Sequence, residues 1–316
     1  MANSSFKSFR AIITIIMINI YKDITLILVT YRSEKLIVKN LEVLKKFPVV
    51  IIDNSNSDEL EKIISNYGNI DLIKSSKNLG YGAANNLGIS KALTPFILII
   101  NPDILINEDA ISDLLKNFLK DPDNIGILGP SLYDQKMYRR TNGTISYLDQ
   151  LNGFNISNLS NNIPSYNTCC KFLMGCCYLM RRDFFNLLGG FDESFFMYFE
   201  DNDLCDRTLK KGKYIMEVPS SKFIHLENAS SKKNFLTDTK LSIIHKVSSY
   251  IYLKKNNNFR FLIFHIIKNF IDYFQRFIVN LIICKPKKSF KNFLRLVSIV
   301  LYITLLYKVI YKIWNI

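Results

Sequence analysis

The chain has 316 residues, 48% of them hydrophobic, which is enough to bury one full-sized core or one domain with an appendage. Its formal net charge of +14 is uneven, because residues 241–316 contain thirteen Lys or Arg and one acid, Asp272. A basic segment rich in Phe, Ile, Leu and Tyr favours a membrane surface as partner. No zinc-finger spacing, recognition-helix pattern or RNA-binding aromatic motif occurs, so we expect no nucleic acid partner.

The six cysteines do not have the spacing of a disulfide framework. Four of them form the adjacent pairs Cys169-Cys170 and Cys176-Cys177, which flank an apolar stretch. Neighbouring cysteines are poorly suited to stapling loops, and a chain of this length does not need such staples. We expect buried thiols that act as small apolar residues in a reducing compartment, in preference to a metal cluster.

At the N-terminus, Lys7 and Arg10 precede the apolar run 11–20, an arrangement that resembles a signal peptide. No small-x-small cleavage site follows, and the run is shorter than the roughly 20 residues that span a bilayer. An alternative is that the natural start is Met17, which leads directly into the first strand. We expect residues 1–21 to be an extension outside the fold.

The next hundred residues alternate between strand and helix patterns. Apolar runs predict strands over Ile24–Thr30, Val49–Ile52, Ile70–Lys74, Phe96–Ile100 and Ile125–Leu128. Helices are predicted over Glu34–Lys46, Asp58–Tyr67, Ala83–Leu93 and Glu108–Leu119, the last with Asn107 as its N-cap. Continuous apolar strands that alternate with amphipathic helices predict an α/β fold, a mostly parallel sheet with helices on both faces.

Residues 131–168 lack periodicity, and we expect loops there that shape a binding site. Order returns at Lys171–Met180, followed by helices near Arg182–Leu188 and Glu200–Lys211, the second ending at Gly212. Strands near Tyr214–Val218 and Lys222–His225 complete a globular domain over residues 22–235.

Residues 236–316 are expected to form an amphipathic helical region that associates with a membrane. A helix over Phe259–Cys284 would place Arg260, Lys268 and Arg276 on one arc and aromatic and branched side chains opposite. The linker Lys285–Lys288 breaks the helix, and the apolar segment Leu296–Tyr307 is too short to span a bilayer but suits its interface. The alternative is a helical pair that packs on the domain or on a second subunit, as in a homodimer.

Polar residues follow several predicted strands at the edge where open parallel sheets bind ligands. They are Thr30 and Tyr31, Asp53 and Asn54, and Asn101 and Asp103. The segment Asn78–Gly88, with Gly80 and Asn85, then leads into a helix, and its glycines let the main chain approach a ligand closely. Each group alone is typical of an ordinary turn, but three groups on one edge predict a site.

The segment Gly189–Arg207 carries six carboxylates among aromatic side chains. Some of these acids are expected simply to favour the start of a helix. A solvated face would not need so many aromatic neighbours, however, and carboxylates against apolar walls are typical of general bases. The segment therefore predicts a catalytic carboxylate among these acids. His225, one of three histidines, ends a predicted strand. A lone histidine there would more often be structural, but a site that also contains Asp103 and Asp201 favours a role as a ligand.

The order of these motifs resembles glycosyltransferase family 2, within it the rhamnosyltransferase-like branch that builds bacterial surface polysaccharides. The resemblance covers about residues 22–230 and rests on Val29-Thr30-Tyr31, Val50–Ser55, Asn78–Gly88, Asn101–Asp103, Gly189–Glu193, Phe196–Leu204 and His225. It implies an inverting enzyme of GT-A fold that binds a nucleotide-sugar donor and a glycan or lipid-linked glycan acceptor.

By this resemblance, Asp53 would contact the nucleotide base above a floor of Thr30 and Tyr31. Asp103 would hold Mg²⁺ or Mn²⁺ on the diphosphate, with His225 as a further ligand. Asp201 would be the catalytic base, with Glu200 beside it. The remaining donor-site residues would be Asn54, Asn78, Gly80, Asn85 and Asn101. Asn101 stands where the metal motif usually begins with an acid, which lowers the local negative charge.

The resemblance also implies dTDP-rhamnose as the leading donor. The basic C-terminal region, which lies outside the resemblance, separately predicts a peripheral position on the inner face of the cell membrane. Two alternatives remain open. A sugar nucleotidyltransferase normally has a basic glycine-rich loop after its first strand, where this chain has Thr30-Tyr31-Arg32. A catalytically silent, membrane-associated scaffold that binds nucleotide sugars is disfavoured because Asp103, Asp201 and His225 are all present.

Overall fold

The computed structural model describes residues 19–140, 143–151, 165–226, 235–256 and 259–304, which form two compact units. Within these ranges the first unit comprises residues 19–76, 84–191 and 201–226. The second comprises residues 77–83 and 192–200 together with the described C-terminal residues from 235 onward. Most of the extension expected over residues 1–21 lies outside the described residues.

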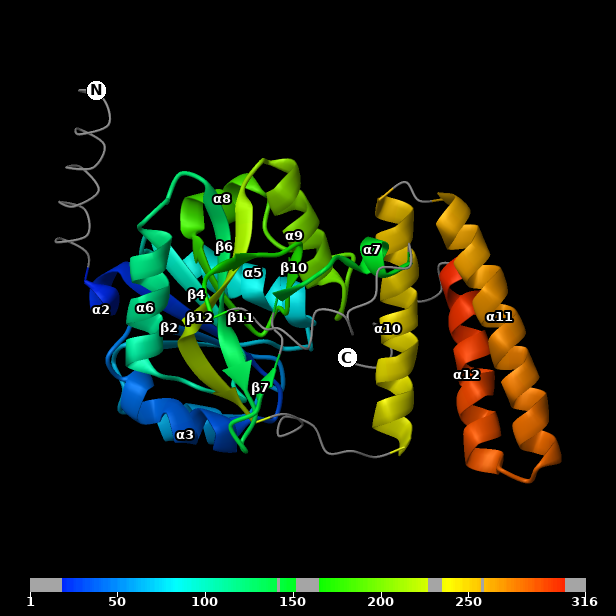
Figure 1. Cartoon of the computed structure of the whole chain (residues 1–316). Coiled ribbons are helices and arrows are strands. Elements are labelled where there is room, and N and C mark those ends of the chain that lie inside the picture. The colour runs from blue at the N-terminus through cyan, green and yellow to red at the C-terminus, as the bar shows by residue number, and fades with distance from the viewer. Residues whose placement is uncertain (1–18, 141–142, 152–164, 227–234, 257–258, 305–316) are drawn as a thin grey trace, which may run out of the picture. The chain divides into compact units, whose positions relative to one another are not determined.

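The first unit begins with the alternation of strands and helices that the apolar pattern predicts (Figure 1). Asn107 caps α6 as expected, since its Oδ1 accepts a hydrogen bond from Asp109 N at 2.9 Å. The elements in this part are α2 (Ile20–Asp23), β1 (Ile24–Thr30), α3 (Glu34–Leu44), β2 (Val49–Asp53), α4 (Asp58–Ile64), β3 (Ile70–Lys74), α5 (Tyr81–Lys91), β4 (Phe96–Ile100), β5 (Ile104–Leu105), α6 (Glu108–Phe118) and β6 (Ile125–Tyr133).

The region after residue 130 contains more regular structure than its sequence predicts. Strand β6 continues to Tyr133, and the two strands expected over 214–225 are one long strand with a register shift between Val218 and Lys222. The remaining elements are β7 (Arg139–Arg140), β8 (Gly143–Thr144), α7 (Tyr147–Leu151), β9 (Thr168–Cys169), β10 (Phe172–Leu173), β11 (Cys177–Arg181), α8 (Arg182–Leu187), α9 (Glu200–Lys210) and β12 (Tyr214–His225).

The principal sheet has the strand order β3-β2-β1-β4-β11-β6-β12-β5. Strands β3, β2, β1 and β4 are all parallel, and β12 is parallel to β6, whereas β11 and β5 run antiparallel to their neighbours. The predicted mostly parallel sheet is thus confirmed. Because β1, β2 and β4 run the same way, the polar residues that follow them lie at one edge of the sheet.

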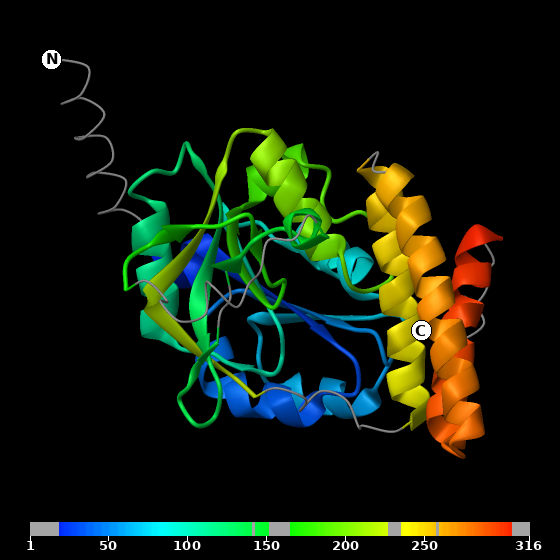
Figure 2. The same ribbon diagram turned by 45° about the vertical axis from the view of Figure 1, so that its right-hand side comes forward.

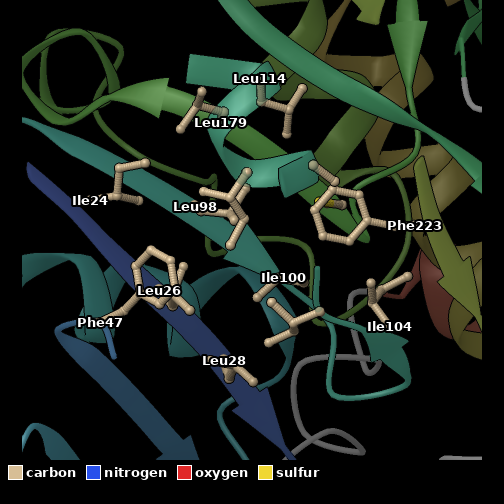
Figure 3. Close-up of a cluster of buried hydrophobic side chains, with 14 of the residues drawn as sticks. Ile24, Leu26, Leu28, Phe47, Leu98, Ile100, Ile104, Leu114, Leu179 and Phe223 are labelled. Carbon is tan, nitrogen blue, oxygen red and sulfur yellow. The ribbon is translucent and has the colours of Figure 1, made fainter. Parts of the chain in front are cut away.

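The two faces of β1 pack against different helices because successive side chains of a strand alternate. Ile24, Leu26 and Leu28 belong to a buried cluster that includes Leu114 of α6 (Figure 3). Ile27 points the other way, toward α5, where a Cβ at Gly88 would lie 3.0 Å from Ile27 Cγ2. Helices therefore cover both faces, and each buried leucine or isoleucine contributes about 1.5–3 kcal/mol to stability.

The second unit is dominated by three long helices, α10 (Phe235–Lys255), α11 (Phe259–Ile282) and α12 (Pro286–Ile303), shown in yellow, orange and red in Figures 1 and 2. The ring of Tyr250 in α10 lies 5.1 Å from that of Tyr302 in α12. Ser289 Oγ of α12 donates a hydrogen bond to Phe277 O of α11 at 3.0 Å. The three helices therefore pack on one another.

The C-terminal sequence was only partly interpreted correctly. Helix α10 lies in the region expected to be helical but was not predicted as a separate helix, whereas the helix expected over Phe259–Cys284 is α11. The expected linker Lys285–Lys288 does separate two helices, but α12 already begins at Pro286, a favoured residue for a first helical turn. Among the described residues, no helix combines the length and the apolar character needed to cross a bilayer.

Candidate active site

The side chain of Asp53, at the carboxyl end of β2, is completely buried. Its Oδ1 accepts hydrogen bonds from Ser55 N at 2.9 Å and from Thr30 Oγ1 at 3.4 Å. Its Oδ2 accepts one from Ser57 N at 2.6 Å. The parallel register places Thr30 directly opposite Asp53. The turn after β2 therefore fixes the orientation of this carboxylate, and the structure brings together Thr30 and Asp53 as predicted.

The two neighbours of this pair differ in exposure. Asn54 is buried, and its main-chain N–H donates to Thr30 O at 2.9 Å, so it joins the ends of β1 and β2. Tyr31 is 42% exposed, and the guanidinium of Arg32 lies 5.3 Å from its ring centroid. Arg32, which the sequence did not single out, therefore adds a positive charge beside the Tyr31 ring.

Asp103 and His225 meet although they lie far apart in the sequence. His225 Nε2 is 3.4 Å from Asp103 Oδ1, and Leu226 N donates to Asp103 O at 2.8 Å. The pairing is produced by β12, which runs antiparallel to β5 with His225 opposite Ile104. The predicted Asp–His pair therefore exists, and the Asp103 side chain is buried.

Asn40 supports the turn that carries Asp103, a role that the sequence did not reveal. This buried side chain of α3 donates from Nδ2 to Ile104 O at 2.8 Å and accepts at Oδ1 from Ile106 N at 2.9 Å. An amide that bonds main chain on both of its ends fixes that main chain. The signal was an asparagine on the buried face of an amphipathic helix, where an apolar residue is expected.

Asp201 stands in the first turn of α9, in a partly buried position. Its Oδ2 accepts a hydrogen bond from Gly175 N at 3.2 Å, and its Oδ1 accepts one from Asn202 N at 2.8 Å. Burial raises the pKa of Asp201, and these N–H donors offset part of that rise. The structure thus gives this carboxylate a fixed orientation and a higher affinity for protons.

The segment Gly175–Cys176, before β11, connects Asp201 to the turn of Asp103. Gly175 donates to Asp201, and Cys176 O accepts from Asn101 N at 2.9 Å. Burial raises the pKa of Cys176 to about 12, and the negative charges of Asp103 and Asp201 contribute to this rise. Both carboxylates therefore lie close to one neutral thiol, and the sequence gave no sign of this junction.

Two other predicted residues, Asn78 and Gly80, belong to the second unit. Gly80 N donates to Asn78 Oδ1 at 2.9 Å, and Gly80 has a φ of +83°, which glycine adopts without strain. Tyr81 N donates to Phe196 O at 2.9 Å, and a Cβ at Gly80 would lie 2.2 Å from that oxygen. The Gly80 turn is therefore packed directly against Phe196 in the segment Gly189–Arg207, which we call the acidic–aromatic segment.

Asn85 and Asn86 follow in α5, and both belong to the first unit. Asn85, the predicted binding residue, is completely buried. Asn86 was not predicted to be a site residue. Its side-chain amide bonds both main-chain groups of Phe191, accepting a hydrogen bond from Phe191 N at 2.8 Å and donating one to Phe191 O at 2.9 Å. The start of α5 therefore anchors the chain where it enters the acidic–aromatic segment.

The six acids of this segment separate into different environments. Asp192 pairs with Lys255 at 2.6 Å and Asp203 with Arg207 at 2.7 Å, so both have structural partners. Glu200 is 4% exposed. The pKa of Tyr198 is raised mainly by the burial of its own side chain and further by the negative charge of Glu200. The expectation that some of these acids are structural therefore fits Asp192 and Asp203, and Glu200 stays a catalytic candidate beside Asp201.

Residues 25–189 match the family model described as glycosyl transferase family 2. The chain belongs to glycosyltransferase family 2. It is therefore a glycosyltransferase, and the alternatives of a nucleotidyltransferase and of a silent scaffold are set aside. The family expected from the order of the motifs is confirmed.

Two curated relatives are rhamnosyltransferases by name. The N-acetylglucosaminyl-diphospho-decaprenol L-rhamnosyltransferase of Mycobacterium tuberculosis is 29% identical over 230 residues, which cover 65% of this chain and 74% of that protein. Rhamnosyltransferase WbbL of Escherichia coli K12 is 26% identical over 256 residues, which cover 74% of this chain and 96% of that protein. The glycosyltransferase is thus similar to the rhamnosyltransferase-like branch.

The fold also matches a solved structure. The mannosyltransferase PcManGT from Pyrobaculum calidifontis, in complex with GDP-Man and Mn²⁺, is 17% identical with a TM-score of 0.52, and the match covers 78% of this chain and 70% of that chain. At this identity the likeness concerns the fold alone. It confirms the expected GT-A architecture of the glycosyltransferase.

Proposed function

We propose that this protein transfers rhamnose from dTDP-rhamnose to a hydroxyl of a glycan or lipid-linked glycan, with inversion at the anomeric carbon, in the synthesis of a cell-surface polysaccharide. The observation that carries the proposal is the fixed position of the Asp201 carboxylate. It accepts a hydrogen bond from Gly175 N–H, and the carbonyl of the next residue, Cys176, accepts one from Asn101 N. The names of both relatives support rhamnose as the sugar. The name of the Mycobacterium tuberculosis relative, which includes N-acetylglucosaminyl-diphospho-decaprenol, supports a lipid-linked acceptor.

The donor nucleotide is assigned to the ends of β1 and β2. Asp53 is the acceptor for the base, because its carboxylate is fixed by the turn after β2. Thr30, Tyr31 and Asn54 form the floor of that pocket. Asn78, Gly80, Asn85 and Asn101 are assigned to the diphosphate and the sugar, because side-chain amides can donate hydrogen bonds to anionic oxygens and a glycine lets the main chain come close to a ligand.

Asp103 and His225 are assigned to a divalent cation, Mg²⁺ or Mn²⁺. The two side chains lie 3.4 Å apart, and the described residues contain no group of three or more such ligands. A pair fits this role, because such cations in phosphate sites use few protein ligands and complete their shell with water and substrate oxygens. When bound, the cation would neutralise charge that develops on the departing diphosphate.

Asp201 is assigned to proton transfer. Its raised pKa makes the carboxylate a better proton acceptor than an exposed aspartate while leaving it able to ionise. The acceptor oxygen gives its proton to Asp201 as it bonds to the anomeric carbon, and the bond from that carbon to the diphosphate oxygen breaks. One displacement of this kind inverts the anomeric configuration.

Replacing the base tests this assignment. Asp201→Asn keeps the shape of the side chain, so we expect dTDP binding to be unchanged while the transfer rate falls by about 10²–10⁴-fold. Asp206→Asn, on the same helix, serves as the control and is expected to keep its activity. Isothermal titration with dTDP and a product assay with dTDP-rhamnose supply the two measurements. Transfer at the wild-type rate by Asp201→Asn would refute the proposal.

The metal assignment has its own test, which does not depend on turnover. We expect Mn²⁺ to increase the thermal stabilisation of the wild-type protein by dTDP-rhamnose, because it adds binding energy to the native state. Asp103→Asn and His225→Gln should lose this increment and keep the stabilisation by nucleotide alone. An unchanged increment in both variants would exclude this pair as the metal site.

We also propose that α11 binds the inner face of the cell membrane. Its outer stripe consists of Phe264, Ile267, Ile271, Phe274, Ile278 and Ile282, which recur every three or four residues and are between 36% and 73% exposed. Residues 259–303 contain eight Lys or Arg and one acid, Asp272, which pairs with Arg276 at 2.8 Å. An exposed apolar stripe with basic flanks complements an anionic lipid surface.

Vesicle binding by the full-length protein tests this surface. Phe264→Ser with Ile271→Ser should weaken binding to phosphatidylglycerol vesicles at least tenfold, whereas Leu93→Ser with Leu187→Ser, exposed apolar positions outside the helix, should not. If the α11 variant instead binds vesicles normally and changes the oligomeric state in light scattering, the stripe is a homodimer interface and the membrane proposal is wrong.

A further inference from the structure

One face of the C-terminal half of α10 contacts residues 192–199 of the acidic–aromatic segment. The contacting residues are His245, Ser248, Tyr252 and Lys255. Their spacing of three, four and three residues places them on one side of a helix. Both partners of every contact belong to the second unit. The sequence predicted membrane association for the whole of residues 236–316, whereas the stripe proposed to bind the membrane is on α11.

Two of these contacts are polar. Ser248 is completely buried, and its Oγ donates a hydrogen bond to Met197 O at 2.8 Å. Lys255 Nζ lies 2.6 Å from Asp192 Oδ2, and this contact lowers the pKa of Asp192 against the effect of its burial. Because the Ser248 hydroxyl is buried and Met197 is partly buried, this hydrogen bond is shielded from water and fixes the main chain at Met197.

The other two contacts are aromatic. The ring centroid of His245 lies 5.2 Å from that of Tyr198 and 5.2 Å from that of Phe199. About two turns further along the helix, the buried Tyr252 lies 5.5 Å from Phe199. These are favourable separations for tilted ring pairs. Helix α10 therefore holds two successive side chains that immediately precede Glu200 and Asp201.

The main chain at these two positions is strained. Tyr198 has a φ of 70° and Phe199 a φ of 69°, in the left-handed region that bulky L-residues rarely occupy. Such conformations persist when the surrounding structure enforces them, and they cluster at functional sites. Tyr81 N adds a further constraint through its hydrogen bond to Phe196 O at 2.9 Å.

We propose that α10 positions the catalytic base, because it holds residues 197–199 in the strained conformation that sets the direction of the chain into Glu200–Asp201. Ser248 and His245 are positioning residues in this proposal, which rests on Asp201 as the base. The C-terminal region then contributes to the chemical step itself, whether or not a lipid surface is present.

Two neighbouring serines provide a matched test. Ser248 bonds Met197, whereas Ser249, also buried, donates only to Lys246 O of its own helix at 2.7 Å. With dTDP-rhamnose and a detergent-soluble acceptor, Ser248→Ala should lower kcat about 10- to 100-fold and leave the donor KM within about twofold, because misplacing a base affects the rate more than donor binding. Ser249→Ala should keep the wild-type kcat.

A second variant tests the strained backbone. Asparagine enters the left-handed region more readily than tyrosine, so Tyr198→Asn in the Ser248→Ala background should restore kcat severalfold. Equal kcat losses in the two serine variants, wild-type kcat in Ser248→Ala, or no gain from Tyr198→Asn would each overturn the proposal. The Asp201→Asn variant, in which α10 is unchanged, distinguishes a failure of this proposal from a failure of the proposed function. Wild-type turnover in that variant would refute Asp201 as the base.

Discussion

The main-chain N–H of Gly175 donates a hydrogen bond to Oδ2 of Asp201 at 3.2 Å. A Cβ at position 175 would lie only 3.0 Å from Asp201 Cβ, so the glycine allows the two chains to approach this closely. The next residue, Cys176, bonds Asn101 through its carbonyl oxygen. This short segment therefore sets the distance between the proposed base and the proposed metal-binding turn.

We expect Gly175→Ala to impair catalysis more than folding. The added methyl group must displace Asp201 by a few tenths of an ångström or more, and displacements of about 1 Å cost on the order of 10²-fold in rate. The prediction is a fall in kcat of about 10- to 100-fold, measured with saturating donor. Gly68→Ala, where a Cβ would meet nothing within 4 Å, is the control and should keep the wild-type rate.

The raised pKa of Asp201 predicts the acidic limb of the pH–rate profile. The base must be ionised to accept a proton, so kcat/KM should fall as the pH drops through the raised pKa of Asp201, above the ordinary range of an aspartate. Gly175→Ala, which disturbs one donor to this carboxylate, should move that limb further up. A limb at the ordinary aspartate pKa in both proteins would contradict the assignment.

The same pKa shift predicts that the base costs stability at neutral pH. Because the folded-state pKa of Asp201 is raised, the native state binds the proton more tightly than the unfolded state. Its stabilising effect is present at low pH and is lost as the pH rises through the folded-state pKa. Asp201→Asn should therefore raise the Tm at pH 7 but not at pH 3, and a lower Tm at pH 7 would contradict this.

Asn40 and Asn69 form a matched pair for testing the turn that carries Asp103. Asn40 bonds Ile104 O and Ile106 N, whereas Asn69 Nδ2 bonds Leu44 O and Phe47 O, away from the proposed site. Alanine at either position should cost about 1–3 kcal/mol for each buried group left unpaired, measured by urea unfolding. Only Asn40→Ala should also weaken the Mn²⁺-dependent binding of dTDP-rhamnose, and equal effects would refute the distinction.

Gly88 allows α5 to lie against the sheet, and its replacement should be destabilising in a way that can be reversed. A Cβ at Gly88 would lie 2.3 Å from Ile52 Cδ1, so Gly88→Ala overpacks this contact and should cost about 1–3 kcal/mol in urea unfolding. Ile52→Val removes that methyl group and should recover part of the loss in the double variant. Simple additivity of the two changes would show that the clash is not the cause.

The positioning role of α10 also affects how the C-terminal region should be dissected. A truncation near residue 240 removes most of α10 and with it Ser248 and Tyr252. Loss of activity in such a protein would not distinguish a lost membrane contact from a misplaced base. Substitutions on the exposed stripe of α11 leave the contacts of α10 with residues 192–199 intact, so they test the role of the stripe without displacing the base.

The sequence alone determined the local structure of the first part of the chain well, because β1, β2 and β4 are predominantly apolar runs and helices such as α6 have a clear apolar periodicity. Ile24–Thr30, Ile70–Lys74 and Phe96–Ile100 are strands with the predicted bounds. The pairing of strand-end residues such as Thr30 and Asp53 also followed, since parallel strands in one sheet end at the same edge. The family followed from the order of these motifs.

Only the tertiary structure decided what connects these groups. The contacts of Asn40 with Ile104 and of Gly175 with Asp201 join residues far apart in the chain, and no local periodicity encodes such pairs. Helix α10 escaped prediction because its contacting face combines histidine, serine, tyrosine and lysine, which mark no apolar stripe. This face of α10 is recognisable only from its contacts with residues 192–199, and those contacts form only when the chain folds.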